Sequence, residues 1–137
     1  LEIDSDMEYD AEFIMLSKTL DNIINELKIF DSDVIIMCNE NQISFNSNGS
    51  EGSMKYILYD LTSEKDFVEE YSCLEEIDIK LLYSIKLLTI FTSFEKITKD
   101  VKLEFSEDKP MKLLYKLDDT SYLSFYLSNK LMEDAEY

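Results

Sequence analysis

The side chains of this sequence that could do chemistry are carboxylates, lysine amines and two thiols. Among 137 residues there are 30 Asp and Glu and 13 Lys, with no His and no Arg. Without imidazole there is no common general base at neutral pH and no serine or cysteine triad, and without guanidinium there is no arginine finger. A carboxylate- or lysine-based hydrolase needs paired groups in contrasting environments, and the carboxylates here are scattered. We therefore predict that the chain is not an enzyme and has no catalytic residues.

Phosphate-binding and metal-binding loops are also missing. Gly49 and Gly52 are the only glycines, so no GxGxxG or P-loop can be written, because both need several positions without a Cβ atom. Cys38 and Cys73 form no CxxC pair, which favours a reducing compartment over a disulfide framework. The acids at positions 4, 6 and 8 only superficially resemble a calcium loop, which requires glycine at its sixth and glutamate at its twelfth position. We predict no cofactor and no metal site.

Charge is distributed unevenly along the chain. The formal net charge is -17 at pH 7, yet residues 80–116 hold eight lysines against five acids. A positive face can meet a phosphate backbone if the acids are held elsewhere, and lysines scattered over a solvated surface are the alternative. The apolar runs Val34–Cys38 and Ile85–Leu88 are far shorter than the roughly 20 residues of a bilayer span, so no membrane partner is expected. The start at Leu1, without an initiator Met, indicates a fragment.

The first half of the sequence predicts a strand, a helix and three more strands. Apolar residues at i, i+3, i+4 and i+7 from Leu20 indicate an amphipathic helix, with Ser17 at its N-cap position and an end near Phe30. Strands are expected at 8–15, 34–38, 42–47 and 54–60, and Asn48-Gly49 and Gly52 are turn signals between the last two.

The second half repeats this order. Strands are predicted at 67–72 and 77–82, followed by a helix from Ser84 to about Phe94 and strands at 101–105, 111–117 and 122–127. The apolar residues of this helix also suit a strand. Two helices and many strands are most simply arranged as an α+β domain, a duplicated βαβββ unit with both helices on one layer and antiparallel sheets outside.

Segments along nearly the whole chain carry a family likeness. They are Leu1 to Tyr9, Val34 to Cys38, Phe45 to Gly49, Ser106 to Pro110, and the ending Tyr122 to Lys130 with the acidic tail after it. In order and spacing, these segments resemble the C-terminal domain of the proliferating cell nuclear antigen family, the eukaryotic sliding clamps, preceded by the end of the interdomain connecting loop. The duplicated βαβββ unit is also the domain topology of that family.

The resemblance implies a DNA clamp (processivity fold) domain and three parts of the chain. Residues 1–8 match the end of the connecting loop, 9–130 the clamp C-terminal domain and 131–137 an acidic tail. In the family, three two-domain protomers close into a ring around duplex DNA, with helices lining the hole and sheets outside. The expectation for the full protein is a nuclear homotrimer that slides on DNA of any sequence. Its expected protein partners are DNA polymerase, the clamp loader and other proteins carrying the clamp-interaction motif.

The resemblance also implies a pocket for partner peptides. Family members bind a glutamine followed by an aliphatic residue and two aromatics, between the connecting loop and the C-terminal sheet. The matching positions are Leu1, Ile3, Pro110, Tyr126, Leu127, Ser128 and Asn129. An apolar plug in a rimmed pocket is a common source of affinity. Plain strand residues and a frayed chain end are the alternative interpretation. Ser128 and Asn129 replace the usual Ala-Pro, so the rim and the choice of partner are expected to differ.

A DNA-facing surface is implied by the helical positions. The matching residues are Lys18, Asn22, Asn25, Lys28 and Lys86. Lysine suits sliding because it contacts phosphates as a point charge without reading bases. Asn22 and Asn25 stand where the family usually has arginines, and they donate hydrogen bonds without long-range attraction, so weaker DNA contact is expected. Solvated lysines are the alternative.

The subunit contact of the family uses the edge strand that matches residues 54–59. Here Met54, Tyr56 and Leu58 alternate with residues that are also largely apolar, and such an edge is an aggregation risk unless a partner covers it. Burial within the same domain is the alternative. In the family each interface joins this domain to the neighbour's N-terminal domain, so this chain alone is not expected to form trimers.

Two other functions remain open. A damage-checkpoint clamp subunit has the same architecture in a heterotrimer, and an intact partner pocket and homotrimer formation argue against it. An acidic protein-binding module that does not engage DNA is favoured by the net charge and by Asn22 and Asn25. Salt-dependent retention of the intact protein on duplex DNA argues against the module.

Overall fold

The periodicity of the first half produces the elements it predicts. The computed structural model describes residues 9–62 and 68–131. In it β1 (Ala11–Leu16) leads directly into α1 (Ser17–Leu27), and the strands that follow are β2 (Asp33–Asn39), β3 (Gln42–Gly49) and β4 (Gly52–Asp60). The apolar stripe of α1 is buried, as expected when a helix packs one face on a core.

The second half contains the repeated unit together with one connecting strand. Its elements are β5 (Val68–Cys73), β6 (Ile79–Ser84), α2 (Ile85–Thr92), β7 (Asp100–Ser106), β8 (Lys109–Lys116) and β9 (Tyr122–Leu127). The helix predicted from Ser84 is confirmed, and Ser84 is its N-cap, with Oγ accepting a hydrogen bond from the Leu87 N–H at 3.4 Å. A capping hydroxyl satisfies one of the unpaired amides of a first helical turn.

The two units exchange their first strands. One antiparallel sheet has the order β5-β1-β7-β8-β9 and the other the order β4-β3-β2-β6. Strand β1 therefore pairs with β7 of the second unit, and β6 pairs with β2 of the first unit. Each sheet is thus completed by a strand of the other unit, which joins the two halves around one core.

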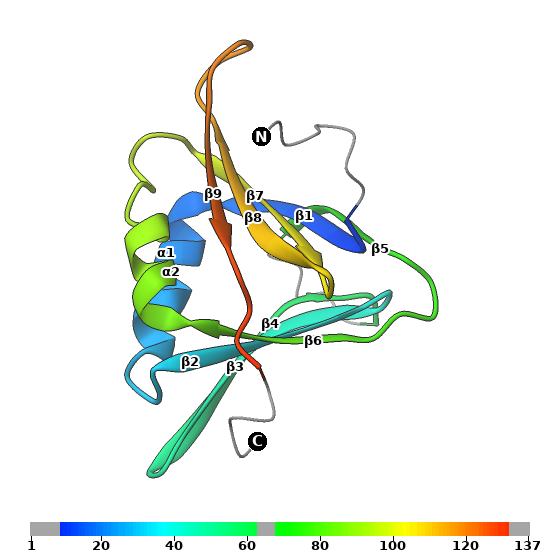
Figure 1. Ribbon diagram of the computed structural model, residues 1–137, viewed down its shortest axis with the longest axis vertical. Helices are drawn as coiled ribbons and strands as arrows, with labels where there is room; N and C mark the ends of the chain where they lie inside the picture. Colours follow the sequence, from blue (N-terminus) through cyan, green and yellow to red (C-terminus); the bar gives the residue numbers. More distant parts are fainter. Residues whose placement is uncertain (1–8, 63–67, 132–137) are drawn as a thin grey trace.

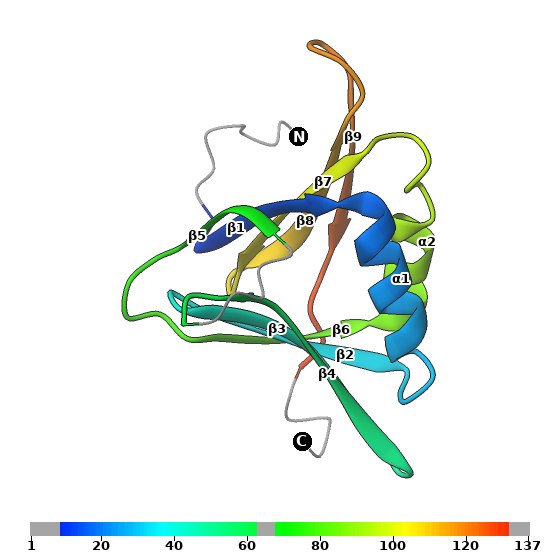
Figure 2. The ribbon, with the colours of Figure 1, turned by 180° about the vertical axis from the view of Figure 1, so that it is seen from behind.

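Both helices lie side by side on one side of the molecule, with the two sheets spread away from them (Figures 1 and 2). A hydrogen bond of 3.2 Å from Thr92 Oγ1 to Asp21 Oδ1 links α2 to α1. The largest fully buried side chains include Phe13, Phe45, Tyr83, Phe105 and Tyr115. The predicted α+β arrangement with both helices on one layer and antiparallel sheets is confirmed.

The predicted N-cap at Ser17 is wrong. Strand β1 runs into α1 without a loop, so the cap position falls on Leu16 and Ser17 is already helical. The buried Ser17 hydroxyl instead lies 3.0 and 3.1 Å from the carbonyl oxygens of Glu95 and Lys99, in the segment that connects α2 to β7. This serine thus ties the start of one helix to the chain that follows the other.

The turn predicted between residues 47 and 54 is confirmed, but it lies between the turn signals Asn48-Gly49 and Gly52 rather than on them. Gly49 pairs with Gly52, so the turn of the hairpin consists of Ser50 and Glu51. A Cβ atom on Gly49 would overlap the carbonyl oxygen of Phe30. Glycine is therefore needed at this position for the close approach of another backbone rather than for the turn.

In the part of the chain that the structure describes, no helix is long and apolar enough to cross a membrane. Within the same residues, no group of three or more His, Cys, Asp and Glu side chains is placed to hold a metal ion. The acids at positions 4, 6 and 8, interpreted above as a solvated linker, lie outside the described residues.

Candidate functional site

Strand β9 forms one edge of the five-stranded sheet and carries two of the predicted pocket residues. Leu127 is only 5% exposed and belongs to the core, opposite Met111 of β8. Tyr126 is half-buried opposite Lys112, whose Nζ lies 5.9 Å from the centre of the tyrosine ring. Successive strand side chains point to opposite faces, so Tyr126 is the residue of this pair that presents its side chain on the outer face.

Neighbouring side chains extend the surface around Tyr126. Pro110 is exposed, two residues before Lys112 on β8, and therefore shares its face of the sheet. Tyr9 lies beneath Lys109, whose Nζ is 5.2 Å from the ring centre. Partial burial, and then the charges of Glu104 and Tyr126, raise the pKa of the Tyr9 phenol. The sequence interpretation did not single out Tyr9, although its place directly after the predicted connecting loop was a usable signal.

The segment after β9 continues the surface around Tyr126. Ser128 is exposed and Asn129 is half-buried. Lys130 follows them, and its backbone N–H donates to the carbonyl of Leu82 on β6 at 2.7 Å. Leu1 and Ile3, predicted for the facing wall, lie outside the described residues. Pro110 and Tyr126 therefore share the outer face of the sheet and residues 128–129 follow directly after it, whereas the Leu127 side chain belongs to the core. The pocket itself stays a prediction.

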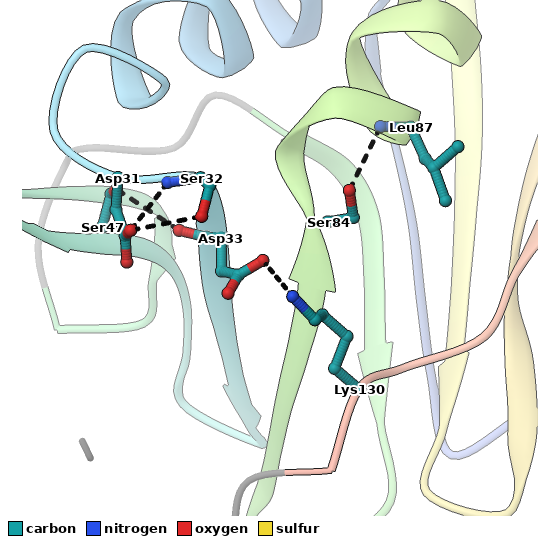
Figure 3. A network of polar contacts seen from close by, with 7 residues as sticks. All are labelled: Asp31, Ser32, Asp33, Ser47, Ser84, Leu87 and Lys130. Atoms are coloured by element: carbon teal, nitrogen blue, oxygen red, sulfur yellow. Dashed lines mark hydrogen bonds and ion pairs between the residues drawn. The ribbon is translucent and has the colours of Figure 1, made fainter. Parts of the chain in front are cut away.

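Sequence reasoning missed the ion pair that holds this segment. Lys130 Nζ lies 2.9 Å from Asp33 Oδ1 at the start of β2 (Figure 3). No spacing rule connects two residues 97 positions apart, so only the folded arrangement of the sheets reveals the contact.

The predicted DNA-facing residues lie on the helix layer. Lys18, Asn22 and Lys28 are exposed on α1 or its C-cap, and Asn25 is half-buried. Lys86 is exposed in the first turn of α2. Figure 2 shows α2 beside α1. The two acids of α1 both have hydrogen-bonding partners at its flanks, since Asp21 accepts from Thr92 and Glu26 from the Tyr56 hydroxyl.

Strand β4 is the edge of the four-stranded sheet. Its predicted interface residues pack toward their own domain, because Leu58 is fully buried and Met54 and Tyr56 lie against the core. The outer edge of β4 pairs with no other strand of the described residues. A contact with a neighbour at this edge would therefore use main-chain hydrogen bonds more than these three side chains.

The two thiols are not activated. Cys38 is buried and Cys73 half-buried. Burial is the largest effect on both, and it raises the pKa of each thiol above its ordinary value. A raised pKa keeps cysteine in the thiol form at neutral pH, and the thiolate is the nucleophile. Neither residue is thus suited to covalent catalysis.

Two helices on one layer and two antiparallel sheets made from a duplicated βαβββ unit define an α+β domain of the DNA clamp type. The family model described as "Proliferating cell nuclear antigen, C-terminal domain" matches residues 3–130. The chain belongs to this family.

Similarity to individual proteins agrees with the family match. The chain is 31% identical over 126 residues to the proliferating cell nuclear antigen of Dictyostelium discoideum, covering 90% of this chain and 48% of that protein. It is 29% identical over 144 residues to proliferating cell nuclear antigen 1 of Plasmodium falciparum, covering 97% of this chain and 52% of that protein. The chain therefore spans about half the length of these relatives.

Proposed function

We propose that the intact protein is a subunit of a DNA sliding clamp, a non-enzymatic processivity factor that encircles duplex DNA in the nucleus. The observation that carries the proposal is the division of the two candidate surfaces between layers. Lys18, Lys28 and Lys86 are exposed on adjacent helices. Tyr126 stands on the outer face of a sheet edge. Membership of the family supports the same conclusion.

The helix layer supports contact with DNA that is independent of sequence. Flexible lysines contact phosphates at every register along the duplex with nearly equal energy, which is what sliding requires. Asn22 and Asn25 add hydrogen-bond donors to this layer without adding charge. With a formal net charge of -17, this chain taken as a whole repels DNA. Retention on DNA would therefore depend on ring closure more than on affinity.

Ring closure would use the open edge of β4. An edge strand with unpaired main-chain groups recruits another strand unless something protects it. We assign this edge to a strand of the neighbouring subunit's N-terminal domain, so that three intact protomers close a homotrimer. The half-buried side chains of Met54 and Tyr56 would then support the strand from the side of its own core.

The outer surface around Tyr126 would bind the clamp-interaction motif of DNA polymerase, the clamp loader and other replication and repair proteins. An aromatic side chain beside an exposed proline offers apolar contact area at a small loss of conformational entropy. Connecting-loop residues Leu1 and Ile3 would form the facing wall. Ser128 and Asn129 would give the rim hydrogen-bonding groups that a proline lacks.

The test is a fluorescence-anisotropy titration of a labelled clamp-interaction peptide against the intact protein. Saturable micromolar binding is expected, and Tyr126→Ala should weaken it at least tenfold, about 1.4 kcal/mol. The control is Tyr122→Ala, which removes an equally large side chain that is 67% exposed at the other end of β9. An equal loss in both variants, or no binding by folded wild-type protein, would contradict the pocket and favour a checkpoint-type clamp.

A further inference from the structure

The chain crosses from one sheet to the other directly after the proposed pocket wall. Strand β9 ends at Leu127 in the five-stranded sheet, and three residues later Lys130 forms a bridge with Leu82 of β6, the edge of the four-stranded sheet. Figure 1 shows this segment descending from β9 across β6. Ser128 and Asn129 therefore span a gap between two sheets and are anchored on both sides.

The far anchor contains an ion pair. Beyond the 2.7 Å backbone hydrogen bond to Leu82, the Lys130 side chain reaches across β6 to Asp33 on β2, with Nζ 2.9 Å from Oδ1. The Asp33 side chain is only 13% exposed and that of Lys130 is 51% exposed. A pair with one shielded partner is screened less by solvent than one between two fully exposed groups.

Asp33 is itself firmly placed. It begins β2 opposite Ser84 of β6, and its carbonyl accepts a hydrogen bond from Ser47 Oγ at 3.3 Å. The preceding Ser32 carbonyl accepts from the Ile85 N–H at 2.9 Å, which fixes the start of β2 to the start of α2. Lys130 is thus tethered to a point that is itself held by two strands and a helix.

We propose that Lys130 is a positioning residue for partner docking, which acts by holding residues 128–129 in the path that shapes the pocket rim. This inference rests on the proposed function of the Tyr126 surface. The rim contains Ser-Asn, and without a proline its backbone has two free dihedral angles per residue. Ordering such a segment has an entropic cost. Because the tether at Lys130 already orders the segment in the free protein, peptide binding does not carry this cost.

The test combines peptide affinity with amide hydrogen exchange in the intact protein. Lys130→Met removes the charge and keeps most of the aliphatic stem, and Asp33→Asn removes the opposite charge at nearly constant shape. Each variant should weaken peptide binding about three- to fivefold, and the double variant should bind no more weakly than either single one. Exchange of the Lys130 amide, measured without peptide, should be faster in all three.

The matched control is Lys80→Met, an equal change of charge at an exposed position of β6, which should bind and exchange like wild type. High salt screens the ion pair, so it should bring the peptide affinity of the wild type closer to that of Lys130→Met. Wild-type affinity in Lys130→Met, whether or not its amide exchanges faster, would overturn the positioning role. Absence of peptide binding by the wild type would contradict the proposed function itself, and the exchange rates would then still show whether the ion pair orders the segment.

Discussion

The two βαβββ units share a topology but bury different chemistry. In the first unit the buried polar residues are three serines, and the large buried side chains are aliphatic, Met or Phe. The second unit buries Tyr83 and Tyr115 completely, together with Thr92, Glu104 and Ser106. The Tyr115 hydroxyl donates to the Phe91 carbonyl at 2.9 Å, whereas that of Tyr83 has no hydrogen-bond partner among the described residues. The topology therefore tolerates polar groups in its core. The second unit contains the buried tyrosine hydroxyls, whose ionisation can destabilise the fold.

Alkaline pH should expose this difference most strongly. Burial raises the pKa of Tyr83 and Tyr115 above the ordinary value of 10.0. Because the folded-state pKa is the higher one, this stabilisation is complete below about pH 10 and is lost as the pH rises further. We expect cooperative unfolding in that alkaline range, followed by circular dichroism and tyrosinate absorbance. The variant Tyr83→Phe/Tyr115→Phe should unfold at higher pH, and an unchanged midpoint would mean that these hydroxyls do not set the limit.

The two buried tyrosines should themselves differ. Tyr115→Phe deletes a hydrogen bond and leaves the Phe91 carbonyl without its donor, so the free energy of unfolding should fall by about 1–2 kcal/mol. Tyr83→Phe deletes a hydroxyl without a partner among the described residues and should cause no loss. Urea denaturation of the two variants measures the difference. Equal destabilisation would show that the Tyr83 hydroxyl is paired in solution.

The starts of the two helices offer a smaller contrast. Ser17→Ala removes a buried hydroxyl from the carbonyls that follow α2, and should destabilise the fold by about 1 kcal/mol. Ser84→Ala removes a long cap bond of 3.4 Å and should cost about 0.5 kcal/mol. Amide exchange around residues 95–99 should quicken only in Ser17→Ala. Faster exchange there in both variants would mean that Ser17 has no specific link to that segment.

Local periodicity was sufficient to predict the elements but not their pairing. The alternation in 54–60 and the helical spacing from Leu20 both depend on near neighbours, and both are confirmed. The exchange of β1 and β6 between the sheets depends on contacts across most of the chain, which no local pattern encodes. The cap predicted at Ser17 is wrong although a hydroxyl before an apolar stripe is typical of a cap, because only the direct junction of β1 with α1 excludes that role.

The residues of the candidate site also fall into those that the sequence predicts and those that only the folded structure reveals. The resemblance pointed to Tyr126, and its outward position on β9 follows from strand alternation. The same alternation places Leu127 in the core, so its contribution to a pocket would be indirect. The ion pair between Asp33 and Lys130 could not be predicted from the sequence, because the spacing of residues does not indicate contacts between distant parts of the chain. Leu1 and Ile3 stay predictions, since they lie outside the described residues.

We expect the intact protein to be held on DNA by encirclement rather than by affinity. The most direct measurement is its retention on closed circular duplex DNA, loaded by its clamp loader and washed at high salt, before and after one cut linearises the circle. Because salt weakens phosphate contacts but not a topological link, the protein should stay on the circle and leave the linear DNA. Equal release from both forms by folded protein would contradict encirclement and favour an acidic module that does not engage DNA.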